Sequence, residues 1–179
     1  QAETGQRYWM HEYSSQYRDR FGFGNGPRCR PISDGNYVYT LGVEAQLNCL
    51  ELSSGRVLWK RNLKEEFDLT LDFFGVAGAP LLEGDLLIIN IGAPEGPCVA
   101  AFDKRTGKMI WGAGNEWGPS YSSPIPAETN AGRKIFVFAG GESRPATGGL
   151  LIIDPETGEV NCSFPWRGGR YESVNASSP

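Results

Sequence analysis

The sequence has no excess of positive charge and no long apolar run. Its 17 lysine and arginine residues are outnumbered by 21 aspartate and glutamate residues, which gives a formal net charge of −4. A protein that binds nucleic acid through a basic surface is therefore not expected. No apolar run approaches the roughly 18 residues of a membrane-spanning helix, because one of the longest is residues 86–89. We expect no nucleic-acid partner and no membrane span.

Groups that bind metals or act as nucleophiles are also sparse. The four cysteines, at positions 29, 49, 98 and 162, form no C-x-x-C pair, and His11 is the only histidine. Clustered zinc ligands and hydrolase motifs are missing, and the glycine-rich stretch 22–26 lacks the lysine of a phosphate-binding loop. We therefore expect no metal site and no catalytic residue. The sequence leaves open whether the cysteines form a disulfide between repeats.

What the chain does contain is an internal repeat. The pattern acid-x-x-Thr-Gly-x-x-x-Trp recurs, with variations, at residues 1–9, 51–59, 103–111 and 154–162. Its glycines are Gly5, Gly55, Gly107 and Gly158, which are 50, 52 and 51 residues apart. The acid is Asp103 in the third copy and Asp154 in the fourth, and the tryptophans are Trp9, Trp59 and Trp111. The copies vary at three positions, where Gln1 replaces the acid, Ser54 the threonine and Cys162 the tryptophan.

Each repeat contains four short runs of β-branched and aromatic residues between turn formers, which predicts four strands. The expected strands are 32–33, 37–41, 47–52 and 57–63, then 81–82, 86–91, 98–102 and 109–111, then 125, 135–139, 150–153 and 160–164. Four-stranded units that repeat every 40 to 50 residues or so are typical of β-propeller blades. A β-sandwich, the rival fold, gives no reason for the repeat.

The acid-x-x-Thr-Gly element predicts the turn between the last two strands of a repeat. A short polar side chain there can accept hydrogen bonds from nearby backbone amides, and a glycine such as Gly107 can take a positive φ without steric cost. The tryptophan then lies on the following strand. We interpret it as a large apolar wedge against a neighbouring sheet rather than as a surface for stacking a ligand.

The stretch Ala101-x-Asp103-x-x-Thr106-Gly107-Lys108-x-x-Trp111 resembles the tryptophan-docking motif of the pyrroloquinoline-quinone (PQQ) repeat. That family includes quinoprotein dehydrogenases and also propellers that bind no quinone, such as the lipoprotein of the bacterial outer-membrane assembly machine. The resemblance implies an all-β fold, a partial β-propeller of four-stranded antiparallel blades. It also implies a periplasmic or cell-envelope location. Fold does not fix function, so the resemblance says less about activity.

Propellers of this family have seven or eight blades, at about 50 residues each. We therefore expect residues 1–179 to form one partial propeller domain that belongs to a longer ring, with the remaining blades as partners. Its parts are the outer strand that ends one blade, with a linker (1–30), and three whole blades (31–79, 80–123 and 124–178). An open arc would leave sheet edges and apolar blade faces exposed.

In a propeller, the loops that enter the innermost strands line the mouth of the central channel. Here they are residues 23–30, 72–78, 118–123 and 167–178. Their polar and aromatic side chains could form a ligand-binding mouth. The candidate residues are Arg28, Arg30, Asp72, Tyr121, Ser122, Arg170, Glu172 and Asn175. The alternative interpretation is that these side chains pin the loops and pair between blades.

Two functions are compatible with these features. The first is a non-catalytic propeller without a cofactor, a binding or scaffold module for a protein or a small polar ligand. The alternative is part of a PQQ- and calcium-dependent alcohol or sugar dehydrogenase. In that family a glutamate and an asparagine hold calcium, roles that Glu172 and Asn175 could imitate. The disulfide between adjacent cysteines that those enzymes carry has no counterpart here, because no two cysteines are adjacent.

Overall fold

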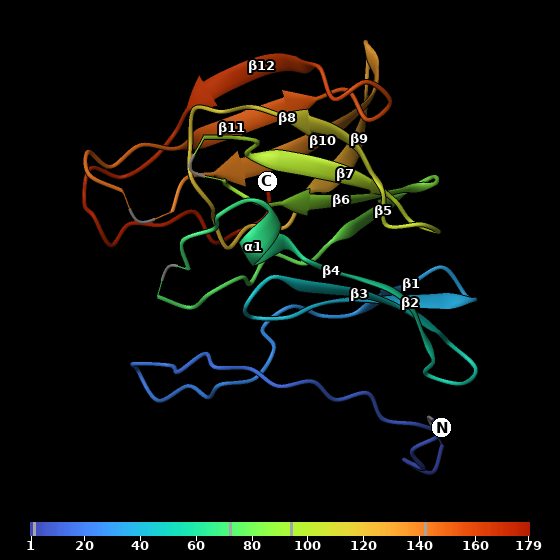
Figure 1. Cartoon of the computed structure of the whole chain (residues 1–179). Coiled ribbons are helices and arrows are strands. Elements are labelled where there is room, and N and C mark those ends of the chain that lie inside the picture. The colour runs from blue at the N-terminus through green and yellow to red at the C-terminus, as the bar shows by residue number, and fades with distance from the viewer. Residues whose placement is uncertain (2, 72, 94, 142) are drawn as a thin grey trace.

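The computed structural model describes residues 1, 3–71, 73–93, 95–141 and 143–179, and within them it contains three antiparallel sheets of four strands (Figure 1). The first sheet comprises β1 (Ile32–Ser33), β2 (Tyr37–Leu41), β3 (Gln46–Glu51) and β4 (Val57–Asn62). The second comprises β5 (Leu81–Glu83), β6 (Leu86–Asn90), β7 (Val99–Asp103) and β8 (Met109–Ala113). The third comprises β9 (Ile125–Thr129), β10 (Gly132–Ala139), β11 (Gly149–Ile153) and β12 (Val160–Pro165). The predicted all-β class and the four-stranded blades are confirmed.

The strands of each sheet follow one another in chain order, so every connection within a sheet is a hairpin. The register superimposes the three repeats. Tyr39 pairs with Cys49 and Cys49 with Trp59 in the first sheet. The equivalent rows are Ile88, Ala101 and Trp111 in the second sheet and Phe136, Ile152 and Cys162 in the third. The 50-residue repeat of the sequence is therefore a repeat of backbone pairing.

The three sheets are stacked in chain order, and the N-terminal segment runs beside the first sheet (Figure 1). Hairpin turns gather at the right of this view, and we call this side the turn end; it holds residues 34–36, 52–56, 84–85, 104–108, 130–131 and 154–158. The connections between sheets gather at the left with the remaining hairpin loops. We call that side the loop end; it holds residues 17–30, 42–45, 63–71, 73–80, 91–93, 95–98, 114–124, 140–141, 143–148 and 166–179.

Two apolar cores lie between the sheets. One joins the first and second sheets, with Tyr39, Leu47 and Phe102 fully buried. The other joins the second and third sheets around Ile88 and Val137. Alternating side chains of the second sheet enter opposite cores, because successive residues of a strand point to opposite faces. Burial on both faces explains the near-continuous apolar sequence of β6.

The outer face of the third sheet is less covered. Cys49 and Trp111 lie in the buried rows of the first two sheets, where Cys49 is 0% and Trp111 8% exposed. In the matching row of the third sheet Cys162 is exposed, and nearby Phe164 is 54% exposed. This outward face therefore keeps apolar groups in contact with water.

Two details differ from the expected strands. A single helical turn, α1 (Leu63–Glu66), follows β4 because Leu63 turns into the first core and the next three residues favour helix. Residues 3–30 contain no strand, although Trp9 reaches the first sheet. Strand assignment needs a paired neighbour, and this segment runs along the sheet without pairing to it.

Candidate functional site

The repeated turn is organised by its aspartate. Oδ1 of Asp103 accepts hydrogen bonds from the backbone amides of Arg105 (3.1 Å) and Thr106 (2.7 Å) and from the Thr106 hydroxyl (2.7 Å). These bonds, led by the hydroxyl, lower the pKa of Asp103. Gly107 closes the turn with φ +70°, a conformation that glycine adopts without strain. Asp154 builds the same turn with Glu156 and Thr157.

Each repeated tryptophan lies on the glycine of the next repeat. The Trp59 indole N–H donates to the backbone oxygen of Lys104 at 3.1 Å, and a Cβ at Gly107 would lie 2.7 Å from Trp59 Cε3. The same contact joins Trp9 to Leu52 and Gly55, and Trp111 to Pro155 and Gly158. The turn end therefore holds consecutive repeats together, and its tryptophans pack against the chain itself.

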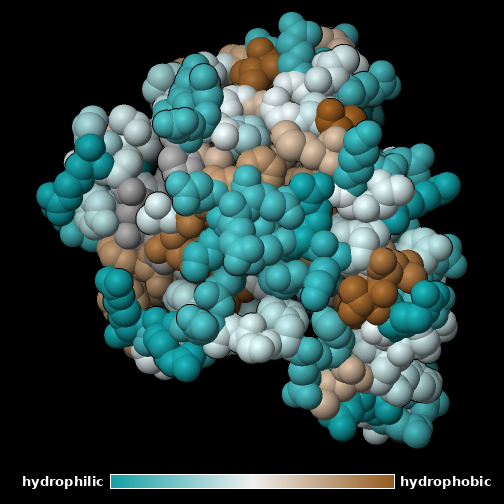
Figure 2. Space-filling view, in the orientation of Figure 1, coloured by the Kyte–Doolittle hydropathy of each residue, from teal (hydrophilic) through white to brown (hydrophobic). Residues whose placement is uncertain are grey.

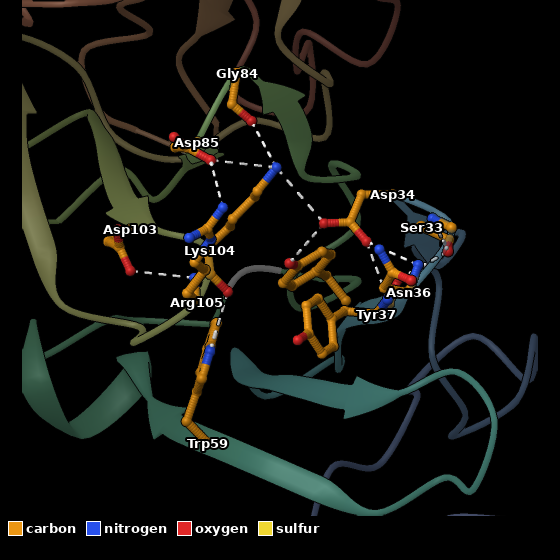
Figure 3. A network of polar contacts seen from close by, with 12 residues as sticks. Ser33, Asp34, Asn36, Tyr37, Trp59, Gly84, Asp85, Asp103, Lys104 and Arg105 are labelled. Carbon is orange, nitrogen blue, oxygen red and sulfur yellow. Dashed lines mark hydrogen bonds and ion pairs between the residues drawn. The ribbon is translucent and has the colours of Figure 1, made fainter.

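A charged network strengthens this end where the first and second sheets meet (Figure 3). Lys104 Nζ lies 3.6 Å from Asp34 Oδ2 and 3.5 Å from Asp85 Oδ1, and it donates to the Gly84 carbonyl at 3.0 Å. Burial opposes ionisation of Asp34, but amide hydrogen bonds and Lys104 lower its pKa overall. Lys104 thus bridges two sheets through its side chain and anchors Trp59 through its backbone.

The loop end is different, because aromatic rings from four loops meet there. We define the aromatic loop cluster as Phe21, Phe23, Phe73, Phe74, Tyr121 and Tyr171. Phe74 is central, with ring centroids 5.6 Å from Phe21, 6.0 Å from Phe23 and 5.5 Å from Tyr121. Phe21 is 52% and Phe23 73% exposed. The space-filling view is mostly hydrophilic, and one of its hydrophobic areas lies at the left, where the loop end lies in Figure 1 (Figure 2).

Arg28 contacts both the backbone and the ring of Phe74 in this cluster. Its Nε donates to the Phe74 carbonyl at 2.9 Å, and its guanidinium carbon lies 5.4 Å from the centre of the Phe74 ring. It also forms an ion pair with Asp19 at 3.3 Å. The Phe21 amide and Arg28 both lower the pKa of Asp19. The Arg28 side chain is only 18% exposed, so it positions the rings rather than facing solvent.

Three other predicted residues also hold the loops together. The Tyr121 hydroxyl accepts a hydrogen bond from the Phe74 amide at 3.2 Å, and the Tyr121 amide donates to the Asn175 carbonyl at 3.0 Å. The Asn175 side-chain amide donates to the backbone oxygens of Ala139 and Trp166. Ser122 is fully buried. Arg28, Tyr121 and Asn175 are thus linked across four loops, in the manner of the pinning interpretation.

The remaining predicted residues stand apart from this linkage. Arg30, Arg170 and Glu172 are exposed. Among the described residues, their side chains form no ion pair. Asp72 lies outside the described residues.

Sequence reasoning missed the residues at the centre of the cluster, Phe73 and Phe74. A signal was present, because two adjacent phenylalanines directly precede Gly75 in the stretch that connects two sheets. The contact with Phe21 could not be read from the sequence, since 53 residues separate Phe21 from Phe74.

A buried amide was missed as well. Asn90 is 5% exposed, and its Nδ2 donates to the Ser120 hydroxyl at 2.8 Å and the Phe138 carbonyl at 2.9 Å. Its Oδ1 is buried and has no protein partner. The adjoining cavity, which Tyr121 also lines, has a volume of about 10 Å³. That is room for about one water molecule, which needs roughly 10–15 Å³.

Among the described residues, no three His, Cys, Asp or Glu side chains gather as a metal site. The amide of Asn175 is committed to backbone oxygens, and the four cysteines are free. Burial raises the pKa of the Cys29 thiol to about 12 and that of Cys49 to about 11, which keeps both protonated.

No helix in the described part of the chain is long and apolar enough to cross a membrane. No curated protein sequence matches the chain.

Several solved structures share the fold. The quinohemoprotein alcohol dehydrogenase of Comamonas testosteroni is 17% identical, with a TM-score of 0.68, over 98% of this chain and 33% of that chain. The enzyme ADHIIG of Pseudomonas putida HK5 is 19% identical, with a TM-score of 0.61, over 80% and 21%. BamB of Moraxella catarrhalis is 16% identical, with a TM-score of 0.50, over 74% and 34%. The chain thus spans about a third or less of each relative, and the likeness is one of fold.

A family profile supplies the assignment. The profile described as outer membrane protein assembly factor BamB matches residues 1–178, almost the whole chain. Together with the three blades and their repeated turns, this match shows that the chain belongs to the family of the outer membrane protein assembly factor BamB.

Proposed function

We propose that this chain is a non-catalytic, protein-binding part of a β-propeller, and that the aromatic loop cluster is its docking surface. The observation that carries the proposal is that Phe21 and Phe23 are exposed while their rings contact the ring of Phe74. Aromatic side chains and arginine are enriched at protein interfaces and supply much of their binding energy. Exposed phenylalanines stabilise a folded chain little by themselves.

The cluster is also pre-organised for binding. Arg28 fixes the Phe74 carbonyl, and the Tyr17 hydroxyl donates to the Phe73 carbonyl at 2.8 Å. The Phe74 amide donates to Tyr121. Because hydrogen bonds already hold the backbone of these residues in place, binding a partner would cost less conformational entropy.

The shape of the site favours a protein over a small ligand. Small-molecule pockets usually enclose about 300–1,000 Å³, whereas the cavity beside Tyr121 has room for one water. The most exposed rings stand outward. The dehydrogenase alternative is compatible with the fold of the relatives, but it draws no support from a cluster of His, Cys, Asp or Glu among the described residues.

The family supports the location that we propose. Its description names an outer membrane protein assembly factor, so we place the protein in the periplasm or cell envelope, with an envelope protein as the partner. The remaining blades of a ring would complete the propeller around this docking surface.

The proposal is tested by site-specific photo-crosslinking. The full chain carries p-benzoylphenylalanine at Phe23 or, as a matched exposed control at the opposite end, at Ile110 (51% exposed), and is illuminated in an envelope extract of the source cells. We expect a discrete cross-linked product from position 23 that is lost with Phe21→Ser and missing from position 110. Equal products from both positions, or none from position 23, would overturn the proposal.

A calorimetric titration of the full chain with PQQ and calcium tests the alternative. We expect no heat of binding. Saturable one-to-one binding would favour the dehydrogenase and overturn the non-catalytic assignment.

A further inference from the structure

Positive charge is treated differently at the two ends of the sheets. At the turn end, five basic side chains lie within 4 Å of carboxylates: Arg56, Lys104, Arg105, Arg133 and Lys134. The strongest of these contacts are short, such as 2.8 Å between Lys134 Nζ and Asp154 Oδ2. Each of these cations therefore has a carboxylate of the same chain beside it, although Arg105 remains exposed.

Unlike Arg28, which pairs with Asp19, three exposed arginines beside the aromatic loop cluster have no such partners in the described part of the chain. Arg20, Arg144 and Arg170 are exposed, and none forms an ion pair within the described residues. Arg20 directly precedes Phe21, and Arg170 directly precedes Tyr171. The guanidinium of Arg144 lies 4.5 Å from the centre of the Tyr171 ring. Cations that form no ion pair within the described residues therefore flank both sides of the cluster, on a chain whose net charge is −4.

We propose that the aromatic loop cluster binds an acidic peptide segment that also carries apolar side chains. This inference rests on the proposed protein-binding function and specifies the chemistry of the partner. Apolar side chains of the segment pack against Phe21 and Phe23, while its carboxylates pair with Arg20, Arg144 and Arg170.

The chemistry of arginine supports this choice of partner. Guanidinium groups form two parallel hydrogen bonds with a carboxylate, and a planar guanidinium keeps this ability while it stacks on an aromatic face, as Arg144 does on Tyr171. A basic segment would meet three unpaired positive charges, which disfavours it. A neutral apolar segment would pack against the rings but would form no ion pair with the arginines.

The rings and the arginines contribute in different ways. Packing on the exposed phenylalanines supplies affinity, since aromatic anchors dominate binding energy. Exposed ion pairs add less, but they select the sign of the ligand and make binding sensitive to salt. Salt dependence therefore separates the two contributions.

The test is fluorescence anisotropy with three labelled hexapeptides on the full chain. One alternates aspartate with phenylalanine, one lysine with phenylalanine, and one aspartate with serine. We expect the aspartate–phenylalanine peptide to bind most tightly. Its affinity should fall about tenfold in Arg20→Gln/Arg144→Gln, and with rising salt. The control Arg105→Gln/Lys108→Gln removes two exposed positive charges from the turn end and should leave the affinity unchanged.

The outcomes separate the two proposals. Equal or tighter binding of the lysine–phenylalanine peptide overturns the acidic partner and leaves protein binding intact. Failure of the aspartate–phenylalanine peptide to bind, beside a positive cross-link at position 23, does the same. Loss of affinity in the turn-end control equal to that in the loop-end variant also overturns the inference, because the attraction would then be non-specific. Loss of the cross-link itself removes the proposed function.

Discussion

The two ends of the sheets are built from the same strands and serve different purposes. At the turn end, the polar side chains of each repeated turn are hydrogen-bonded within the turn, and each tryptophan is packed on the next repeat. At the loop end, rings and arginines reach solvent, and one buried oxygen, Asn90 Oδ1, has no protein partner. The turn-end pattern recurs every 50 residues or so, whereas the loops that carry the aromatic loop cluster differ in sequence and length. The contacts between repeats thus lie in the repeated turns, and the exposed rings lie in loops whose sequences differ.

The sharpest way to break the turn end is Trp111→Ala. Trp111 is 8% exposed and donates to Pro155 from its indole nitrogen. Removing a buried tryptophan typically costs about 3–5 kcal/mol, and urea unfolding of the full chain measures it. Phe164→Ala is the control, because that ring is 54% exposed. A cost no larger than that of the control would show that the indole does not join the sheets.

A smaller loss is expected from Gly107→Ala. The alanine would have to adopt φ +70°, with its Cβ 2.7 Å from the Trp59 ring. Backbone strain of this kind costs about 1–3 kcal/mol, which denaturant unfolding detects. Gly84→Ala is matched in conformation, with φ +59°, but meets no atom within 4 Å. The difference between the two variants measures the contact with Trp59, and equal losses would mean that only strain matters.

The ion pair between Lys134 and Asp154 should make the stability of the protein depend on pH. The hydrogen bond from Lys134, ahead of the amide bonds, lowers the pKa of Asp154 to about 2. Its folded pKa lies below the unfolded value, so the stabilisation is present above about pH 4 and is lost as the pH falls toward 2.

Asp154→Asn should therefore unfold with a shallower dependence on pH between 4 and 2 than the wild type. The loss at neutral pH should stay below about 1 kcal/mol, because the pair is partly exposed to water. Thermal melts across this range test it. An unchanged slope in the variant would argue that other carboxylates carry the acid sensitivity.

The smallest effect on stability is expected at the loop end. Phe23 is 73% exposed, so Phe23→Ser should change the free energy of unfolding by no more than about 0.5 kcal/mol. The same variant should weaken binding of the aspartate–phenylalanine peptide at least tenfold if the ring is an anchor. A large loss of stability would place Phe23 in the packing of the fold and remove the contrast between the ends.

The turn end could be predicted from the sequence because its contacts are local or repeat at a constant interval. Asp103 and Gly107 lie within one turn, and the spacing of Trp59 from Gly107 is one repeat less the four residues that separate glycine from tryptophan. The strands followed from the same periodicity, within a few residues at their ends.

The loop end could be predicted only in part. The loops themselves were located, and Arg28, Tyr121 and Asn175 do meet there. Which groups face solvent depends on how loops of different length fold over one another, and no periodicity encodes it. The unpartnered Asn90 oxygen is a further example, since the residue lies at the end of a strand whose pattern reads as core.

The contact between tryptophan and glycine has a consequence for how such a protein can lengthen. Each repeat contributes two residues to such contacts: a glycine that packs against the tryptophan of the preceding repeat, and a tryptophan that packs against the glycine of the following repeat. A repeat added by gene duplication would therefore bring both the glycine and the tryptophan that contact its neighbours. The two residues of one contact must also change together, so that a bulkier residue at Gly107 calls for a smaller one at Trp59. Cys162 breaks this series, because it takes the place of the tryptophan in the last repeat. A further sheet packed on the third one would have a thiol, rather than an indole, opposite its glycine.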